Sequence, residues 1–582
     1  MENINLTING IRVTAPAGST ILEAAQQAGI RIPTLCYLKD VNPIGACRMC
    51  LVEVKGARST PAACVQEAAE GMEVETNTPA LRESRKKTLE LMLSNHRMEC
   101  LSCVRSLDCE LQSMAQEYNV DAKRYAPAEP IAPAIDTSAV HLVRDNSKCI
   151  LCRKCISVCK RNQHVAVIGA ADRGIKTHIA SPFDGDLADT SCIHCGQCVA
   201  VCPTGALTER DDTDLVWAAL ADPNKHVVVG PAPSVRVQLG ECFGMPIGTN
   251  VEGKMMAALR RLNFDKVFDV DVTADVTIME EGTELLNRLK SGGKLPLISS
   301  CSPGWVKFCE YYYPELLENM SSCKSPQQMF GALVKSYYAE KAGLDPKDVY
   351  VVSVMPCTAK KFEVQRPEMN ATGYPDVDVS ITTKELASMI KRAGIDFEAL
   401  PDEAADPIFG IASGAGLIFG ATGGVMEAAL RTVAEIVTGK PLEKVEFSDV
   451  RGTEAIKEAE YDLAGTKVRV AVASGLANAK RLLDMVKSGE KDYHFIEIMA
   501  CPGGCVNGGG QPYQPGYVRN TIDLRAVRAA ALYSTDQKMA LRKSHESPVV
   551  KELYGTYLDA PGSKKAHHLL HTHYEKREIY KS

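Results

Sequence analysis

The 582-residue sequence has no apolar run near the ~18 residues that a membrane span needs. Its first residues, MENINLTING, have neither the basic stretch nor the apolar core of a secretory signal. The net charge of -6, from 66 basic and 72 acidic residues, is too small and too evenly mixed to indicate nucleic acid or an anionic membrane surface. No nucleotide-binding fingerprint occurs either. These absences predict a cytoplasmic protein with no membrane span, no nucleic-acid partner and no NAD(P) site of its own.

Cysteine is the residue type that stands out from an otherwise ordinary composition. Hydrophobic residues make up 45% and charged residues 24% of the chain, which excludes disordered and fibrous classes, and the length suggests about three or four domains. The chain nevertheless has 22 cysteines. Because disulfides do not persist in a reducing cytoplasm, most of these thiols are expected to bind metal.

Two cysteine runs between residues 149 and 202 have the spacing of a two-cluster bacterial ferredoxin. CILCRKCISVCK and CIHCGQCVAVCP both contain C-x2-C-x2-C-x3-C, in which three close cysteines hold one [4Fe–4S] cluster and the fourth reaches the other cluster. A pair of four-cysteine zinc sites is the alternative, but interleaved runs are dense for zinc. We predict one cluster on Cys149, Cys152, Cys155 and Cys202, and the other on Cys192, Cys195, Cys198 and Cys159.

The first four cysteines predict a [2Fe–2S] site in a β-grasp domain. They are spaced C-x10-C-x2-C-x13-C, which keeps the C-x2-C core and the distant fourth cysteine of plant-type ferredoxins but lengthens the first gap. INLTING, IRVTAPAG and CLVEVKG alternate as strands do, and AGSTILEAAQQAGI has the pattern of a helix. The predicted ligands are Cys36, Cys47, Cys50 and Cys64.

One histidine and three cysteines follow, in NHRMECLSCVRSLDC. The spacing H-x3-C-x2-C-x5-C is also a structural zinc pattern, and by itself it leaves zinc and iron–sulfur open. The preceding RESRKKTLELMLSNH has a helical pattern and would bring the histidine to the loop. A redox-inert zinc between two sets of Fe–S ligands would interrupt a chain of electron carriers, which favours a [4Fe–4S] cluster. Its predicted ligands are His96, Cys100, Cys103 and Cys109.

After about Leu207 the sequence changes to an α/β pattern. HVVVGPAP, LPLISSC, VYVVSVMPC, VRVAVASG and YHFIEIMAC are apolar enough for buried parallel strands. Four of these runs lead directly into Ser234, Cys301, Cys357 and Cys501. Because sites in open α/β sheets lie at the carboxyl ends of strands, these side chains are expected to converge on one site.

Three motifs at these strand ends resemble the signature of the [FeFe]-hydrogenases. The family motifs are T-S-C-C-P-x-W, M-P-C-x-x-K-x-x-E and E-x-M-A-C-x-x-G-C-x-x-G-G-G-x-P. This chain has SSCSPGWVKF, MPCTAKKFE and EIMACPGGCVNGGGQP. The second and third match at every fixed position, and the four N-terminal ligand sets follow the order of the large, accessory-cluster-rich form. The resemblance covers essentially the whole chain.

The resemblance implies an H-cluster, a [4Fe–4S] cubane joined through one cysteine to a two-iron centre with CO, CN⁻ and azadithiolate. Carried over by position, Cys357, Cys501 and Cys505 ligate the cubane, and Cys505 is the bridge. Lys360 is implied to donate to a cyanide, as a buried ammonium can. For the two methionines of this region, ordinary core packing is the alternative. The residues implied to surround the two-iron centre are Pro233, Ser234, Gln327, Met355, Phe419 and Met499.

The first motif departs from the family at residue 302. Where the family has two adjacent cysteines, this chain has Cys301 and Ser302. In the family the first cysteine relays protons and the second is the fourth cubane ligand. Taken by position, Ser302 then replaces a ligand, although hard oxygen suits an Fe–S corner poorly. With a shift of one residue, Cys301 is the ligand and Ser302 the relay, and the sequence leaves both interpretations open.

A proton route to the surface is implied by further matching positions. In TIMEEGTELLNRLK, Glu281, Glu284 and Arg288 share one face of a predicted helix. A charged helical face is usually only solvated, so the pattern alone indicates no more than that. The resemblance adds Cys301 and Ser321 and places all five on the family's proton path.

These observations predict a multidomain α+β and α/β protein. Its parts are a β-grasp [2Fe–2S] domain over 1–78, a one-His/three-Cys [4Fe–4S] segment over 79–135, a two-[4Fe–4S] ferredoxin-like domain over 136–210 and a two-lobed α/β H-cluster domain over 211–582. The expected cofactors are one [2Fe–2S] cluster, three accessory [4Fe–4S] clusters and the H-cluster.

The predicted activity is reversible H₂ oxidation and proton reduction, with electrons relayed through four accessory clusters. The chain is expected to be the catalytic subunit of a complex linked to NAD(P) and ferredoxin, and this expectation includes complexes that are electron-bifurcating. In that complex a flavoprotein subunit would bind NAD(P). A stand-alone ferredoxin hydrogenase is the alternative. A hydrogen-sensing module is a third hypothesis, which Ser302 favours because impaired site chemistry would slow turnover.

Overall fold

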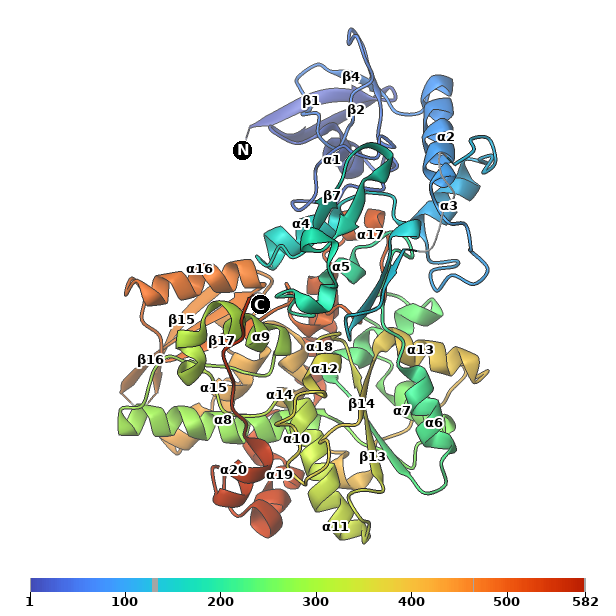
Figure 1. Cartoon of the computed structure of the whole chain (residues 1–582). Helices are drawn as coiled ribbons and strands as arrows, with labels where there is room; N and C mark the ends of the chain where they lie inside the picture. Colours follow the sequence, from blue (N-terminus) through green and yellow to red (C-terminus); the bar gives the residue numbers. More distant parts are fainter. Residues whose placement is uncertain (1, 128–133, 464, 580–582) are drawn as a thin grey trace.

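The computed structural model describes residues 2–127, 134–463 and 465–579. In Figure 1 the residues up to 210 form a narrow arm at the top, and the larger catalytic body, from residue 211 on, lies below it. No helix in the described ranges is long and apolar enough to cross a membrane. The predicted multidomain α+β and α/β class is confirmed.

The first domain is a small sheet with one helix packed on it, as the β-grasp prediction requires. The strand order is β2-β1-β4-β3, and β1 runs antiparallel to β2 and parallel to β4. Thr20 and Glu23 form a capping box at the start of the helix, which satisfies two backbone N–H groups. The elements are β1 (Asn3–Ile8), β2 (Ile11–Pro16), α1 (Ile21–Gln27), β3 (Glu53–Val54) and β4 (Glu73–Glu75).

Two helices frame the one-His/three-Cys segment. α2 (Pro79–Ser94) begins after Thr78, whose hydroxyl accepts from the Leu81 N–H, and its first residue is a proline, which has no N–H to leave unpaired. α3 (Glu110–Glu117) starts directly after Cys109. Buried leucines of both helices belong to one apolar cluster, so the cysteine loop is held between the two helices.

A domain of short elements carries the eight cysteines of the two ferredoxin-like runs. Each run turns through a residue of positive φ, Arg153 at 59° and Gly196 at 67°, and continues into a short helix, α4 (Lys154–Ser157) or α5 (Gln197–Ala200). A Cβ at Gly196 would lie 2.3 Å from Thr358 Oγ1 of the catalytic body, so glycine is required at this junction. The strands around the runs are β5 (Ile135–Asp136), β6 (Leu142–Asp145), β7 (Gly169–Ala171), β8 (His178–Ala180) and β9 (Leu207–Glu209).

The catalytic body has two lobes, each built on a four-stranded sheet. The first sheet is parallel throughout, in the order β11-β10-β13-β14. Its central strands are nearly continuous runs of buried apolar residues because helices cover them. The strands are β10 (His226–Pro231), β11 (Lys266–Val267), β13 (Val349–Met355) and β14 (Val379–Thr382). The helices of this core include α6 (Thr213–Ala221), α7 (Glu252–Arg261), α10 (Pro326–Leu333) and α13 (Thr383–Arg392).

The second sheet has the order β12-β17-β16-β15, with only β15 antiparallel to its neighbour. Along β16, Val468, Val470 and Val472 enter one apolar core, and Ala471 and Ala473 enter the core on the opposite face. The strands are β12 (Leu297–Ile298), β15 (Ile456–Leu463), β16 (Thr466–Ser474) and β17 (Phe495–Met499). One face is covered by α8 (Asp271–Ser291) and α15 (Gly424–Thr438), the other by α9 (Pro303–Tyr312) and α16 (Leu476–Lys487).

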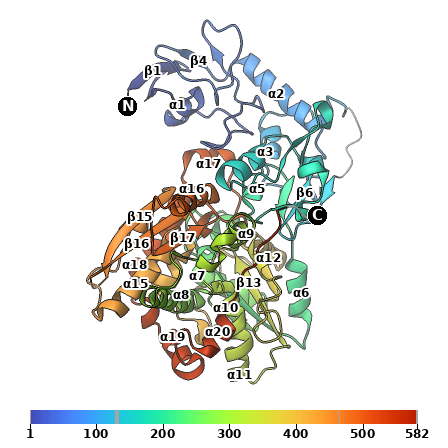
Figure 2. The ribbon, with the colours of Figure 1, turned by 60° about the vertical axis from the view of Figure 1, so that its left-hand side comes forward.

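The C-terminal segment begins beside the arm and continues to the bottom of the catalytic body in Figure 1. After its last helix, α20 (Lys564–Leu570), the chain runs back up toward the arm without regular secondary structure. Figures 1 and 2 show this return as a thin dark red coil. The Thr572 N–H donates to the Ser322 carbonyl at 2.8 Å, and the Arg577 N–H donates to the Glu310 carbonyl at 2.9 Å. The helices of the segment are α17 (Gly516–Thr521), α18 (Leu524–Lys538), α19 (Pro548–Leu553) and α20 (Lys564–Leu570).

Candidate active site and accessory cluster sites

Strands of both sheets end at one buried cavity, as the strand-end pattern predicts. β10 leads into Ser234, β12 into Cys301, β13 into Cys357 and β17 into Cys501, and all four side chains line the cavity. Cys195 of the two-cluster domain also reaches it. The other predicted site residues that line it are Pro233, Ser302, Gln327, Met355, Lys360, Phe419, Met499 and Cys505.

Three thiols face the cavity, Cys501 buried and Cys357 and Cys505 partly buried, and they are close enough to repel one another as thiolates. Burial raises the pKa of Cys501 well above its ordinary value, and the charges of Cys357 and Cys505 raise it further. Burial also raises the pKa of Cys505 to about 12, with Cys357 adding to the effect and the Lys360 ammonium opposing it. Thiolates packed in this way need a bound cation to hold their charge.

Lys360 is held at the cavity by a buried carboxylate. Its ammonium donates to Glu363 Oε2 at 2.8 Å and to the Cys301 carbonyl at 3.3 Å. The same Glu363 oxygen accepts from Ser325 Oγ at 2.8 Å and from Gln327 Nε2 at 2.9 Å. An ammonium fixed by two acceptors has a third proton left to donate to an anion in the cavity.

Beside the rest of the cavity lie one hydrogen-bonded amide side chain, that of Gln511, and several apolar side chains. Gln511 Nε2 donates to Ser234 Oγ at 3.1 Å and to the Cys505 carbonyl at 3.2 Å, which links two sides of the cavity. Met355 and Met499 line the cavity and also belong to the apolar cores of the two lobes. Core packing and cavity lining are thus both roles that these methionines fill.

Cys301 and Ser302 have different surroundings. Ser302 Oγ accepts the N–H of Ala500 at 3.3 Å, which places the hydroxyl next to Cys501. Burial raises the pKa of Cys301 well above its ordinary value, and the largest charge contribution comes from Glu281. Cys301 therefore lies on the Glu281 side of the site and Ser302 on the Cys501 side.

The predicted relay residues form one series of neighbours leading away from the cavity. Burial raises the pKa of Glu281 to about 8, and the neighbouring Glu284 charge adds to the rise while Ser321 opposes it by hydrogen bonding. Ser321 Oγ donates to Glu284 Oε2 at 3.1 Å. Arg288 Nη2 donates to Glu284 Oε1 at 2.6 Å. With Cys301 beside Glu281, the structure brings all five residues together.

The first cysteine set forms two thiol pairs. Cys50 Sγ lies 3.4 Å from Cys64 Sγ, and a hydrogen bond between the Cys36 and Cys47 side chains lowers the pKa of Cys47 to about 6. Two pairs suit two irons, each of which takes two thiolates. Four ligands of one tetrahedral zinc would lie roughly 3.8 Å apart. In the part of the chain that the structure describes, no three thiols of any predicted set come within 4.8 Å of one another.

The two ferredoxin-like runs interleave as their spacing predicts. Burial raises the pKa of Cys149 and Cys152, and the charge of Cys202 raises both further, although Cys202 belongs to the other run in sequence. Burial is the main cause of the raised pKa of Cys159, and the charge of Cys192, from the other run, raises it further. In the one-His/three-Cys segment, the buried His96 Nδ1 has no hydrogen-bond partner, and burial lowers the pKa of this imidazole to about 4. A neutral imidazole with a free ring nitrogen is suited to ligate a metal.

Both outer ligand sets approach the same inner set. Asn42 Nδ2 donates to the Cys36 carbonyl at 2.7 Å and to the Cys152 carbonyl at 3.0 Å. From the one-His/three-Cys segment, Arg105 Nη1 donates to the Cys202 carbonyl at 3.2 Å. Cys195, in the other ferredoxin-like run, lies at the catalytic cavity. The accessory sites therefore form a forked series that leads to the cavity.

Comparison with known proteins agrees with this architecture. The description "iron only hydrogenase large subunit, C-terminal domain" matches residues 225–509, and iron–sulfur domain models match 1–79, 85–124 and 148–206. The NADP-reducing hydrogenase subunit HndD of Solidesulfovibrio fructosivorans is 48% identical over 99% of this chain and 100% of its own length. The chain belongs to the [FeFe]-hydrogenase family.

Other relatives support the same assignment. Iron hydrogenase 1 of Clostridium pasteurianum is 44% identical over 98% of this chain and 100% of its own length. A solved structure of a variant of [FeFe]-hydrogenase HydA1 from Chlamydomonas reinhardtii superimposes with a TM-score of 0.56 at 44% identity, covering 62% of this chain and 98% of that one. Fold and family are thus shown, and this hydrogenase is an oxidoreductase acting on H₂ that has [2Fe–2S], [4Fe–4S] and H-cluster domains.

The comparison and the structure also add features that the sequence analysis missed. Residues 522–577 match an iron hydrogenase small subunit, whereas the sequence analysis treated 211–582 as one domain. Glu363 and Gln511 stand in two signature motifs, yet we assigned them no role. Their place in those motifs was the available signal, but only the fold shows that Glu363 anchors Lys360 and that Gln511 joins Ser234 to Cys505.

Proposed function

We propose that this chain is the catalytic subunit of a complex that interconverts protons, electrons and H₂ (2H⁺ + 2e⁻ ⇌ H₂). The observation that carries the proposal is the buried cavity in which Cys357, Cys501 and Cys505 face Lys360 and the Cys301 thiol. When bound, the H-cluster supplies the iron at which H₂ is formed or split. The chain's own residues hold that group, donate hydrogen bonds to it and bring protons to one side of it.

Cys357, Cys501 and Cys505 are the proposed cubane ligands, and Ser302 takes the position of the fourth. The hydrogen bond from the Ala500 N–H to Ser302 Oγ supports this position, because it holds the hydroxyl beside Cys501. Cys301 is then the residue that exchanges protons with the two-iron centre. Its proximity to Glu281 supports that role. This is the positional interpretation of the two that the sequence left open.

The proposed proton route runs from Cys301 through Glu281, Ser321 and Glu284 to Arg288. Each member can donate and accept a proton or hold a neighbour in place: the Ser321 hydroxyl and the Arg288 guanidinium both donate to Glu284. A carboxyl with a pKa of about 8, such as that of Glu281, can take up and release protons near neutral pH. Arg288, whose guanidinium donates to Glu284 at 2.6 Å, is the proposed outer end of the route.

Two variants decide between the interpretations of residues 301 and 302. In protein matured with the two-iron centre, Cys301→Ala should keep the CO and CN⁻ infrared bands and lose H₂ evolution from reduced methyl viologen. Ser302→Cys should raise cubane iron content, because a thiolate suits an Fe–S corner better than an alcohol. If Cys301→Ala loses the bands instead, Cys301 is a ligand. A fully active Cys301→Ala would contradict both interpretations.

We infer that one [2Fe–2S] and three accessory [4Fe–4S] clusters carry electrons and that a flavoprotein subunit with an NAD(P) site exchanges them with the arm. The similarity to an NADP-reducing hydrogenase subunit supports such a partner, and the chain itself has no nucleotide fingerprint. A cytoplasmic location, with ferredoxin as an available donor, is part of the same proposal.

The one-His/three-Cys loop has the surface expected of a docking site for that partner. Met98, Leu101, Val104 and Leu107 are exposed, Leu101 and Leu107 almost fully, around the exposed Cys100. Clustered exposed apolar side chains mark interaction surfaces. This apolar loop borders a predicted cluster, so a partner seated there has a short path for electrons.

Native mass and a surface variant test the partner. The protein isolated from its source should migrate as a complex that contains a flavoprotein; a lone chain would indicate the stand-alone ferredoxin enzyme. Replacing Leu101 and Leu107 with aspartate should slow reduction by the protein partner and leave methyl viologen-driven H₂ evolution unchanged. Ile436→Asp, at an exposed apolar residue of the catalytic body, is the matched control and should affect neither.

A further inference from the structure

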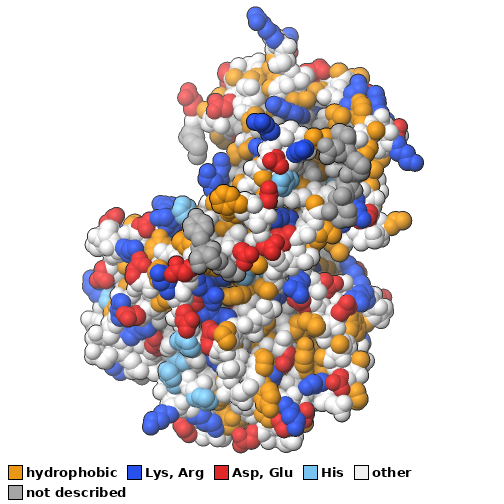
Figure 3. Space-filling view, in the orientation of Figure 1, with side chains coloured by type: hydrophobic (Ala, Val, Ile, Leu, Met, Phe, Trp, Pro, Cys, Tyr) orange, Lys and Arg blue, Asp and Glu red, His pale blue; other side chains and the backbone are white. Residues whose placement is uncertain are grey.

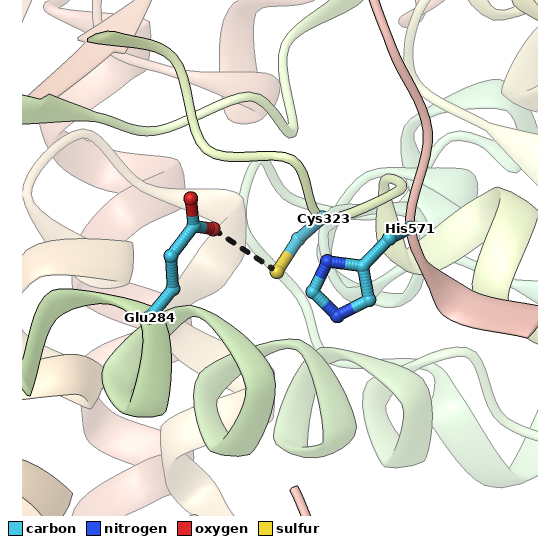
Figure 4. Close-up of side chains that lie close together, drawn as sticks. All are labelled: Glu284, Cys323 and His571. Atoms are coloured by element: carbon cyan, nitrogen blue, oxygen red, sulfur yellow. Dashed lines mark hydrogen bonds between the residues drawn. The ribbon is translucent and has the colours of Figure 1, made fainter. Parts of the chain in front are cut away.

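Three side chains with different metal-binding groups meet beside the proposed proton route. Glu284 comes from α8, Cys323 from the loop before α10 and His571 from the residue after α20, and Figure 4 shows them facing one another. One ligand atom from each lies within 4.8 Å of the other two, and Cys323 Sγ is 3.9 Å from Glu284 Oε2. Cysteine, histidine and a carboxylate are the donors that zinc takes in proteins.

The imidazole of His571 is already oriented as in a metal-binding histidine. Its Nε2 lies 3.1 Å from Glu280 Oε2, and Glu280 is itself fixed by the Tyr554 hydroxyl at 2.5 Å and the Gly562 N–H at 2.8 Å. A carboxylate only accepts, so Nε2 carries the proton and Nδ1 presents a lone pair. Nδ1 now accepts from Ser322 Oγ at 2.8 Å, a bond that a metal can replace. Metal-binding histidines are usually held by a carboxylate on the other ring nitrogen in this way.

Backbone pairing keeps the thiol and the imidazole together. Cys323 and His571 form an antiparallel β-bridge, and the Lys324 N–H donates to the Leu570 carbonyl at 2.8 Å. Cys323 is fully buried, and the side chains of His571 and Glu284 are 5% and 16% exposed. Donors around a tetrahedral zinc lie roughly 3.3–3.8 Å apart, so pairs that now lie within 4.8 Å must approach by at most about 1.5 Å.

We propose that Glu284, Cys323 and His571 form a binding site for one thiophilic divalent cation of the zinc class, and that its occupation stops proton transfer through Glu284. On binding, the Cys323 thiol releases its proton to solvent and forms a metal–sulfur bond. Glu284 Oε2 exchanges its hydrogen bond from Ser321 for a metal bond and can no longer pass a proton between Ser321 and Arg288. The second part of the proposal rests on the proposed function, while the site itself does not.

The site joins two parts of the catalytic body that match separate family models. Glu284 and Cys323 lie within the large-subunit match at 225–509, and His571 lies within the small-subunit match at 522–577. Over α20, Figure 3 shows a group of pale blue histidine side chains on the surface, and His567 and His568 of that helix are exposed. His567 stacks on His571 with ring centroids 4.6 Å apart, so a cation reaching the surface histidines is next to the site.

The binding site is tested on the full-length, cluster-loaded protein with Zn²⁺ alone as the probe. Absorption at the zinc edge is specific to zinc and unaffected by the iron clusters. We expect one sulfur at about 2.3 Å with nitrogen and oxygen donors, and loss of that sulfur in Cys323→Ala. Cys309→Ala removes another fully buried thiol and is the matched control, which should keep the sulfur. Zinc bound without sulfur, or equal zinc spectra in all three proteins, would overturn the site.

The functional consequence is tested by H₂ evolution from reduced methyl viologen at graded Zn²⁺, with iron content measured throughout. Wild type and Cys309→Ala should be inhibited at constant iron content and recover with a chelator. Cys323→Ala and His571→Gln should need at least tenfold more zinc. A zinc–sulfur site without inhibition, or inhibition that all variants share, refutes the block. A protein inactive before zinc is added would contradict the proposed function, and the zinc-edge spectra would still decide the site.

Discussion

Replacing Glu281 with glutamine tests the proposed proton route at its most buried carboxyl. The carboxyl of Glu281 has a pKa of about 8, against 4.5 for an ordinary glutamate. It can exchange protons near neutral pH, whereas an amide of the same shape cannot. Positioned acid–base groups contribute about 10²–10⁴-fold to a rate, so H₂ evolution should fall by a factor in that range, or about 3–5 kcal/mol of barrier.

The same group makes stability depend on pH. Because the folded-state pKa lies above the unfolded one, the native state binds the proton more tightly. The contribution of Glu281 to stability is therefore fully present below pH 4.5 and is lost as the pH rises through 8. At about 1.36 kcal/mol per pH unit, the loss between pH 6 and pH 9 amounts to about 2–3 kcal/mol. Glu281→Gln has no such proton, so its stability should decline less than that of the wild type over this range.

The assay combines rate, cofactor and stability on protein with its full iron content. Glu281→Gln should keep the CO and CN⁻ infrared bands, lose turnover and narrow the difference in unfolding temperature between pH 6 and pH 9. Glu281→Asp keeps a carboxyl and should retain part of the activity. Wild-type turnover in Glu281→Gln with intact bands would refute the route. Parallel pH dependence of unfolding in wild type and variant would refute the raised pKa.

Three further substitutions test other parts of the site. Cys198→Ala should lose about one [4Fe–4S] cluster's iron while the catalytic body stays folded; unchanged iron with added zinc would contradict the ferredoxin-like assignment. His96→Ala should alter a single EPR signal set, because a neutral imidazole ligand raises a cluster's potential relative to a thiolate; identical titrations would exclude His96 as a ligand. Lys360→Met should weaken retention of the two-iron centre, which would appear as fainter CO and CN⁻ bands at constant cubane iron. Lys360→Arg should retain part of the band intensity. Bands in Lys360→Met as strong as those of the wild type would exclude the lysine as a donor.

The fold class could be predicted from the alternation of strand-like and helical patterns. The ligand sets were predicted from short spacings, because cysteines two or three residues apart must share one loop. The strand ends were equally informative: apolar runs leading into Cys301, Cys357 and Cys501 predicted the convergence that the structure shows. The role of the relay residues depended on the family resemblance, since a charged helical face alone does not distinguish a route from a solvated surface.

Contacts between distant segments were beyond the sequence. Nothing around Asn42 indicates that its amide joins loops 110 residues apart, because that requires two domains to be docked. Glu363 follows Lys360 by three residues, a common helical pairing, and only its burial shows that the pair belongs to the cavity and not to a solvated surface. His571 could be placed beside Glu284 only after the C-terminal return was known.

The C-terminal return has a consequence for synthesis of the chain. Every predicted accessory-cluster ligand lies before residue 203, so the arm can fold and receive iron while the catalytic body is still on the ribosome. The loop at Ser321–Lys324 gains its partners at Leu570 and Thr572 only after the whole catalytic body has emerged. This late-translated stretch therefore completes the wall beside Glu284, and a chain released before it would have its electron carriers but an unsupported proton exit.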